Sequence, residues 1–240
     1  MTEKKCLFCG NTPIESKIID HNEYHRCLTC FGIYIDPRHR MDQFSEKERY
    51  ELHDNSIQNA GYRTYLEKFI DSVMCFSAIQ GWITSISDLQ VRIMDYGSGP
   101  EPALVQLLSE KGYEARGWDP FFAPDTPGFK DGAHIVTCLE VAEHFSNPLE
   151  SFSMIAKHLC PGGFLALGTH LLPVVSQGAP LDGKTGIQSD WDAFKNWWYR
   201  QDPTHISFYT LESLRLVAAQ AGLTWLGRAG KQVFIFKYLE

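Results

Sequence analysis

The chain has 240 residues, of which 44% are apolar, 13% aromatic and 21% charged, and its formal net charge is −7. This composition is typical of a folded globular protein and excludes a disordered or collagen-like chain. The negative charge disfavours a nucleic-acid surface, which needs an excess of positive charge. No apolar stretch approaches the roughly 18 residues of a membrane span. No apolar signal segment follows Met1, so we expect a cytoplasmic protein without a membrane span.

Four of the seven cysteines lie near the start of the chain, as two C-x-x-C pairs with a longer segment between them. Four thiolates at this spacing can close a tetrahedral zinc site, although incidental or core thiols are the alternative. Such a site has no open coordination position, so the predicted Zn²⁺ is structural. The segment 1–36 resembles a zinc ribbon, in which Gly10 and Gly32 ease the two turns. The predicted ligands are Cys6, Cys9, Cys27 and Cys30.

The next segment is predicted to be a helical connector. Residues 37–41 read as a linker, and Ser45 with Glu48 fits a capping box that opens a helix to about residue 53. Apolar residues at three- and four-residue spacing predict a second helix over residues 62–80.

From residue 91 onwards, short β-rich runs alternate with helical patterns, which implies an α/β fold with a largely parallel sheet. The expected strands are 91–96, 113–119, 134–141, 164–169, 223–228 and 232–238. The expected helices are 102–111, a helix from Asn147 that ends at the Pro161-Gly162-Gly163 turn, and 210–220. Residues 171–208 show no clear period but are too aromatic for a solvated linker.

A glycine turn follows the first of these strands, in the sequence Asp95-Tyr96-Gly97-Ser98-Gly99. Glycines there let a ligand approach the backbone where open α/β sheets bind cofactors. The dinucleotide fingerprint fails because Pro102 stands where it needs its third glycine. Asp119 ends the next strand and is placed to accept both hydroxyls of a ribose.

Together with Val136–Phe145, which is similar to an E-V-x-E-H signature, these motifs resemble the class I S-adenosylmethionine-dependent methyltransferases. The runs 50–55 and 197–205 resemble a subgroup of that family with an N-terminal zinc ribbon. The resemblance implies a Rossmann-like sheet with flanking helices, preceded by the ribbon. The implied domains are 1–36, the connector 37–89 and a methyltransferase domain 90–240.

By this resemblance, the turn from Asp95 surrounds the methionine part of S-adenosylmethionine, Asp119 binds its ribose, and the residues after Asp119 lie beside its adenine. The residues after the third strand line the sulfonium side. The implied cofactor-binding residues are Asp95, Gly97, Ser98, Gly99, Asp119, Pro120, Phe121, Leu139, Glu140 and Val141. Tyr62 or Tyr65 could offer an aromatic face to the sulfonium, but their place on an apolar helical stripe favours core packing.

Histidine is the best candidate for a base near neutral pH. His205 is the predicted catalytic or acceptor-binding residue, since it precedes the last long helix. The other candidates are His53, His144 and His170, and for each a structural role is the alternative. Trp197, Trp198 and Tyr199 could wall an acceptor pocket or pack in the core, and Arg200 with Asp202 is more readily explained as a surface ion pair.

The leading hypothesis is a methyltransferase acting at oxygen or nitrogen of a small-molecule or carrier-bound acceptor, with S-adenosylhomocysteine as product. The second is an RNA methyltransferase, since a ribbon before such a domain resembles the bacterial 23S rRNA guanine-N1 enzymes; the neutral ribbon and acidic remainder stand against it. The third is a binding protein with a vestigial cofactor site, against which the intact motifs argue. We expect no nucleic-acid partner, and the sequence does not define the oligomeric state.

Overall fold

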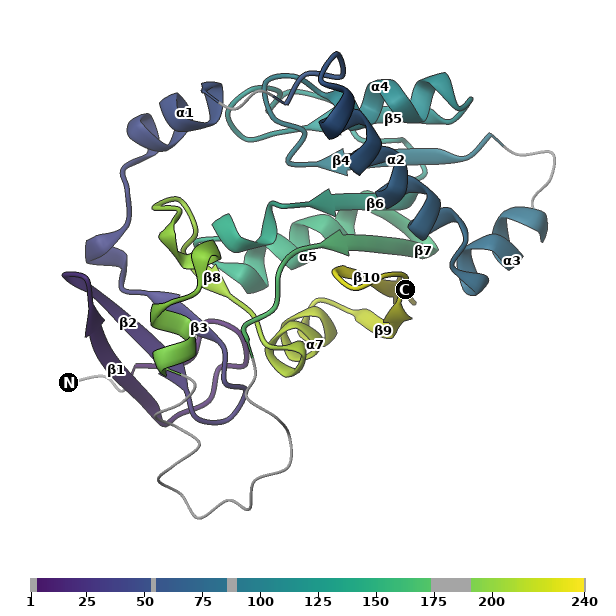
Figure 1. Cartoon of the computed structure of the whole chain (residues 1–240). Helices are drawn as coiled ribbons and strands as arrows, with labels where there is room; N and C mark the ends of the chain where they lie inside the picture. Colours follow the sequence, from purple (N-terminus) through teal and green to yellow (C-terminus); the bar gives the residue numbers. More distant parts are fainter. Residues whose placement is uncertain (1–3, 53–54, 86–89, 174–190, 240) are drawn as a thin grey trace. The chain divides into compact units, whose positions relative to one another are not determined.

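The computed structural model describes residues 4–52, 55–85, 90–173 and 191–239. The chain forms two compact units, which are coloured by sequence in Figure 1. Unit 1 comprises residues 1–41, 143–148 and 170–217, and unit 2 comprises residues 42–142, 149–169 and 218–240. The domain boundaries expected from the sequence stay a prediction. No helix in the described ranges has the length and apolar character needed to cross a membrane.

Unit 2 is built on a six-stranded sheet in the order β5-β4-β6-β7-β10-β9. The first four of these strands pair in parallel, and β10 pairs antiparallel with both β7 and β9. The strands are β4 Arg92–Tyr96, β5 Glu114–Trp118, β6 Ala133–Leu139, β7 Leu159–Gly168, β9 Leu223–Arg228 and β10 Val233–Tyr238. The predicted α/β fold is therefore confirmed.

Helices cover this sheet on both faces. Helix α4 (Ala103–Glu110) connects β4 to β5 and helix α5 (Pro148–His158) connects β6 to β7, and these two crossovers step in opposite directions along the sheet. Because parallel crossovers are right-handed, they place α4 and α5 on opposite faces. Helices α2 (Ala60–Met74) and α3 (Ser77–Ser85) share one hydrophobic cluster with α4 and the sheet.

The helices of the connector differ from the sequence prediction in two ways. Helix α1 spans Gln43–Glu51, and its cap is Asp42, whose carboxylate accepts the N–H groups of Phe44 and Ser45. The expected capping box at Ser45 is therefore wrong, because Asp42 is a better-placed carboxylate acceptor. The expected helix over 62–80 is two helices, since α2 ends at Met74 and the N–H of Phe76 turns back to Val73.

The predicted helix start at Asn147 and Pro148 is confirmed by α5, but the helix ends at His158. Pro161, Gly162 and Gly163 lie inside β7, which begins at Leu159. The pairing of β6 with β7 shifts register between Ala133 and Ile135, so these residues form an irregular strand start rather than a helix-ending turn. Gly163 is needed there because a Cβ would lie 2.9 Å from the Cys160 carbonyl oxygen.

Unit 1 contains a four-stranded antiparallel sheet in the order β1-β2-β3-β8. The first three strands are β1 Ile14–Ile19, β2 Asn22–Cys27 and β3 Ile33–Ile35. The fourth, β8 (Ser207–Phe208), comes from a late part of the chain, and helix α7 (Leu211–Gln220) follows it. The cysteine segment therefore shares its sheet with part of the aromatic insertion.

The described aromatic residues of that insertion, apart from Trp198, pack in the core of unit 1. Phe194, Tyr199, Ile206 and Phe208 are buried in one cluster with Tyr24 of β2. Aromatic pairs such as Tyr24 with Phe194, whose ring centroids are 5.1 Å apart at 79°, pack edge to face. The described part of the insertion thus packs on the small sheet, in agreement with its aromatic composition.

Candidate functional site

The four predicted metal ligands lie together in unit 1. Their sulfur atoms are all within 4.8 Å of one another, with 3.6 Å between Cys6 and Cys30 and 3.6 Å between Cys9 and Cys27. Four thiolates about 2.3 Å from a tetrahedral Zn²⁺ stand about 3.8 Å apart. The geometry of the donors therefore fits Zn²⁺.

Each C-x-x-C pair forms the same local turn. The backbone N–H of Phe8 points to the Cys6 sulfur at 3.3 Å, and that of Thr29 points to the Cys27 sulfur at 3.3 Å. Gly10 has the positive φ expected in the first turn, at +71°. In the second turn the positive φ belongs to Phe31, at +59°, and not to Gly32. Gly32 is required for close packing instead, because a Cβ there would lie 2.5 Å from the Phe8 ring.

The predicted cofactor residues lie at the carboxyl ends of β4, β5 and β6 in unit 2. The chain leaves β4 toward β5 on one side and enters β6 on the other, so the strand order reverses beside β4. Ligands of open α/β sheets bind in the crevice at such a switch point. The turns after β4 and β6 meet there, since a Cβ on Gly97 would lie 2.5 Å from a methyl carbon of Val141.

Asp119 joins the turns after β4 and β5. One carboxylate oxygen accepts the N–H of Gly99 at 2.9 Å, and the other accepts those of Phe121 at 2.8 Å and Phe122 at 3.1 Å. Gly99 has φ +67°, and a Cβ there would meet no atom within 4 Å, so the turn leaves open space at this point. The carboxylate is thereby held in one orientation, with lone pairs left for a further donor.

Asp95 is buried at the end of β4. Its carboxyl accepts the Thr137 hydroxyl at 2.8 Å. Burial, together with the nearby charge of Asp119, raises the pKa of Asp95 to about 7. A group that titrates near neutral pH at a switch point is typical of a functional site.

The segment after β6 carries Leu139, Glu140 and Val141. Glu140 adopts a φ of +52°, unusual for a residue with a side chain, and its N–H bonds the Gly168 carbonyl at 2.8 Å. The hydroxyl of Tyr65 donates to the Glu140 carboxylate at 3.3 Å. Tyr65 is 40% exposed, so the expectation of core packing is wrong for Tyr65, whereas Tyr62 packs against the core of unit 2.

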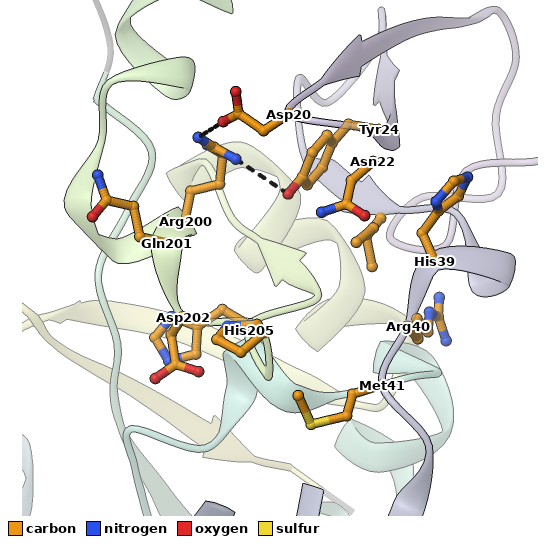
Figure 2. A pocket seen from close by; sticks show the side chains of 12 residues that line it. Asp20, Asn22, Tyr24, His39, Arg40, Met41, Arg200, Gln201, Asp202 and His205 are labelled. Atoms are coloured by element: carbon orange, nitrogen blue, oxygen red, sulfur yellow. Dashed lines mark hydrogen bonds and ion pairs between the residues drawn. The ribbon is translucent and has the colours of Figure 1, made fainter. Parts of the chain in front are cut away.

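Unit 1 contains a cavity of about 440 Å³ between the small sheet and the 200–205 segment. The described residues that line it are Asp20, Asn22, Tyr24, Ile35, His39, Arg40, Met41, Arg200, Gln201, Asp202, Pro203 and His205. Figure 2 shows Arg200 directed at Asp20 and Tyr24, with its guanidinium 2.7 Å from the Asp20 carboxylate. Arg200 therefore pairs with Asp20 and not with Asp202, which instead accepts the N–H and hydroxyl of Thr204.

The histidine candidates fall in different places. His205 lines the cavity, and its imidazole lies beside that of His144, with 4.9 Å between the ring centroids. Burial, with the neighbouring His144, lowers the pKa of His205 to about 4, so its imidazole is neutral at physiological pH. His170 packs against Trp198 and Tyr199. His53 lies outside the described residues.

Of the three aromatic residues before Arg200, Tyr199 is buried in the core of unit 1, whereas Trp198 is 61% exposed. Trp197 packs against the same core. None of the three is among the described residues that line the cavity. Their core-packing interpretation therefore holds for Trp197 and Tyr199.

A family profile described as a methyltransferase domain matches residues 34–226 of this chain. The chain belongs to that family. It is a class I S-adenosylmethionine-dependent methyltransferase, and the cysteine cluster fits an N-terminal zinc ribbon. The match runs from β3 into β9 and therefore includes every predicted cofactor-binding residue.

Solved structures of methyltransferases are also similar to this one. A chain from the complex between the Haloferax volcanii Trm112 methyltransferase activator and a methyltransferase is 12% identical, over 75% of this chain and 96% of that chain, with a TM-score of 0.45. CalS10, an amino pentose methyltransferase from Micromonospora echinaspora determined with S-adenosylmethionine, is 16% identical, over 82% of this chain and 97% of that chain, with a TM-score of 0.41. A search of curated proteins finds no match.

The structure of this methyltransferase brings its predicted residues together in two groups, with the cofactor residues in unit 2 and the cysteines and His205 in unit 1. Sequence reasoning missed Asp20, Tyr24 and Arg40 as cavity residues. No local signal could have found them, because the cavity joins an early and a late segment of the chain. Glu143 belongs to the E-V-x-E-H signature, but the sequence analysis predicts no role for it.

Proposed function

We propose that this methyltransferase transfers a methyl group from S-adenosylmethionine to an oxygen or nitrogen of a small-molecule or carrier-bound acceptor. The observation that carries the proposal is the arrangement around Asp119. Its carboxylate ties the turn after β4 to the turn after β5, where the strand order of the sheet reverses. A switch point with a fixed carboxylate suits a ribose-containing cofactor.

In this proposal each turn of unit 2 holds one part of the cofactor. Asp119 accepts the ribose hydroxyls, while Pro120 and Phe121 lie beside the adenine. The Asp95–Gly99 turn surrounds the methionine part, including Ser98, and Leu139, Glu140 and Val141 line the sulfonium side. S-adenosylmethionine supplies a methyl group on a positively charged sulfur. The Glu140 carboxylate and the Tyr65 ring favour that charge electrostatically.

The chain's own residues must also orient the acceptor, since alignment supplies much of the rate enhancement in methyl transfer. We propose that His205 contacts the acceptor in the cavity of unit 1. Its Nδ1 lies 2.6 Å from the Tyr199 carbonyl oxygen, which can only accept, so Nδ1 carries the proton. Nε2 of the neutral ring therefore presents a lone pair, which suits an acceptor that carries an exchangeable proton.

The zinc of the ribbon has a structural role in this proposal. The four cysteines close its coordination sphere, so the metal would hold the two turns together and leave no position for substrate.

Calorimetric titration of S-adenosylhomocysteine into the zinc-loaded protein tests the proposal. Saturable one-to-one binding at micromolar strength is expected, followed by methyl transfer to small acceptors that persists at high salt. No heat at several temperatures from protein shown to be folded would remove the cofactor site and favour a binding protein. A steep fall of acceptor affinity with salt would favour RNA instead.

A further inference from the structure

Three groups of side chains in the described residues bring potential metal ligands together. The first is the cysteine cluster. The other two each combine histidine with carboxylate, as Glu23 with His25 and Asp36, and as Glu143 with His144 and His205. All three groups lie within unit 1. The two mixed groups have similar donor atoms, so the protein groups around each decide which could hold a cation.

The group at His25 is already filled by protein groups. Both imidazole nitrogens are used, since Nδ1 lies 2.7 Å from the Ser16 hydroxyl and Nε2 lies 2.7 Å from the Asp36 carboxylate. Arg38 and Lys4 add positive charge to the same carboxylate, at 2.8 and 3.2 Å. These side chains occupy the place that a metal ion would take, so this group is a hydrogen-bonded ion-pair network.

The group at His205 is arranged differently. Nδ1 of His144 lies 2.9 Å from the Thr204 carbonyl oxygen, and Nδ1 of His205 lies 2.6 Å from the Tyr199 carbonyl oxygen. A backbone carbonyl cannot donate, so each Nδ1 carries a proton, and in the neutral ring Nε2 has the lone pair that a metal ion needs. Metal-ligating histidines have this arrangement, because a hydrogen bond to the second nitrogen fixes the tautomer and the ring orientation.

A buried carboxylate completes the donor set. Glu143 is 1% exposed, and its carboxylate oxygen lies 3.9 Å from Nε2 of His144. The ligand atoms of Glu143, His144 and His205 are all within 4.8 Å of one another. Ligand atoms around a cation bound at about 2.1 Å stand about 3 to 3.5 Å apart, so small side-chain rotations would close the site.

The backbone holds these ligands in register although they come from two distant segments. The N–H of Ile206 donates to the Glu143 carbonyl at 2.8 Å, and the Ser207 hydroxyl donates to the Phe145 carbonyl at 2.7 Å. Together with the bond from His144 to Thr204, these contacts fasten residues 143–145 to residues 204–207. The cluster is therefore positioned by the fold of unit 1 and not by chance proximity of surface side chains.

We propose that Glu143, His144 and His205 form a second metal site, which binds one divalent transition-metal cation. Two imidazoles and one carboxylate suit Mn²⁺, Fe²⁺, Co²⁺ or Zn²⁺, and three protein ligands leave open coordination positions. Because His205 also lines the cavity, an acceptor oxygen there could complete the coordination sphere. This last step rests on the proposed function, and in it His205 acts through the metal and not as a proton acceptor.

Cobalt titration of the full chain tests the metal site independently of catalysis. The protein is first loaded with one Zn²⁺ per chain, so that the four cysteines are occupied, and Co²⁺ is then added. We expect one further equivalent with weak visible bands and no thiolate-to-cobalt charge transfer. The substitutions Glu143→Gln and His205→Gln should each weaken this binding by about tenfold or more.

His21→Asn is the matched control, because His21 is an exposed imidazole of unit 1 outside the cluster and outside the residues that line the cavity, and asparagine tolerates the φ of +71° at this position. It should bind Co²⁺ as the unaltered protein does. Each variant must keep one Zn²⁺ per chain and its unfolding midpoint, and two ligand variants are used so that one misfolded protein does not decide the result. The absence of a further equivalent overturns the proposal, as does Co²⁺ binding that neither substitution weakens, or cobalt that appears only at thiolates. Calorimetric titration of the same samples with S-adenosylhomocysteine tests the cofactor site separately. Failure of the metal-site proposal can therefore be distinguished from failure of the proposed function.

Discussion

The two units are stabilised in different ways. Unit 2 buries a continuous apolar cluster from α2, α3, α4 and the six-stranded sheet. Unit 1 has a smaller, four-stranded sheet, in which β3 has three residues and β8 has two, and places cysteines, Asp36, His25 and Arg200 in its interior. Burial of apolar area is distributed over many residues, whereas a metal site or a buried ion pair depends on each member. We therefore expect single substitutions to have larger effects in unit 1.

The largest expected effect is that of Cys27→Ser. Cys27 is fully buried, belongs to the cysteine cluster of the predicted zinc site, and accepts the Thr29 N–H at its sulfur. Structural Zn²⁺ sites contribute roughly 10 kcal/mol or more of apparent binding free energy, which is also folding free energy. The variant should lose its zinc, and unit 1 should unfold while unit 2 keeps a cooperative thermal transition, as measured by metal analysis and calorimetry.

Cys75→Ser is the control for this substitution, because Cys75 is an exposed cysteine of unit 2. It should retain one zinc per chain and both thermal transitions. If Cys27→Ser also retained one zinc per chain, the four-cysteine site would be refuted. Simultaneous loss of both transitions would show that unit 2 depends on unit 1.

Asp95→Asn should have the largest single-residue effect on unit 2, and it should be stabilising. The pKa of Asp95 rises from its ordinary value of 3.8 to about 7, chiefly because burial penalises the charged carboxylate. The folded state thus binds the proton more tightly, and stability falls as pH rises from about 4 to about 7. This pKa change corresponds to about 4 kcal/mol, so the variant should be more stable than the unaltered protein above about pH 7.

Chemical unfolding of the two proteins between about pH 4 and pH 8 measures this difference. Burial lowers the pKa of His134 and His158, which gives the opposite trend, but both histidines are present in each protein and cancel in the comparison. Parallel stability curves for the two proteins would contradict the assignment to Asp95.

The contrast between the units also explains what the sequence could predict. Strands β4, β5, β9 and β10 agree with the predicted strands within one or two residues, because short β-rich runs bounded by turns are local signals. The cysteine cluster agrees with the prediction because the two C-x-x-C pairs are a local sequence signal for metal ligands. Helix ends were less accurate, since the cap at Asp42 and the break after Met74 depend on which of several competing hydrogen bonds forms.

Unit 1 shows what local patterns could not predict. Strand β8 pairs with β3 although most of the chain separates them in sequence, and the two residues of β8 carry no periodicity. The grouping of Glu143 with His205 depends on the same long-range pairing, since Ile206 bonds to Glu143 immediately before β8. The position of His205 before the last long helix predicts it as a catalytic or acceptor-binding residue. The tautomer of its ring, however, follows only from the contact between Nδ1 and the Tyr199 carbonyl oxygen, which the sequence does not predict.

Asp119→Ala should weaken S-adenosylhomocysteine binding by about 1.5–3 kcal/mol, the scale of hydrogen bonds to charged groups. The loss includes the ribose contacts of the proposal and the bonds by which Asp119 orders Gly99 and Phe121. Calorimetric titration measures it, with Asp125→Ala as control because Asp125 is an exposed carboxylate of the same loop. An unchanged dissociation constant in folded Asp119→Ala would refute the placement of the ribose.

The smallest predicted effect, that of Tyr65, separates two roles of one side chain. Tyr65→Phe removes an exposed hydroxyl that lies 3.3 Å from Glu140. It should change the affinity for S-adenosylmethionine or S-adenosylhomocysteine by less than about 1 kcal/mol.

Tyr65→Ala also removes the ring, which in the proposal faces the sulfonium. A cation over an aromatic ring at an exposed site gains about 0.5–1 kcal/mol. S-adenosylmethionine carries the sulfonium and S-adenosylhomocysteine lacks it, so the ratio of their dissociation constants should change in Tyr65→Ala but not in Tyr65→Phe. Equal losses for both ligands would instead mean that the ring supports the turn after β6 by packing, and the sulfonium contact would have to come from another residue.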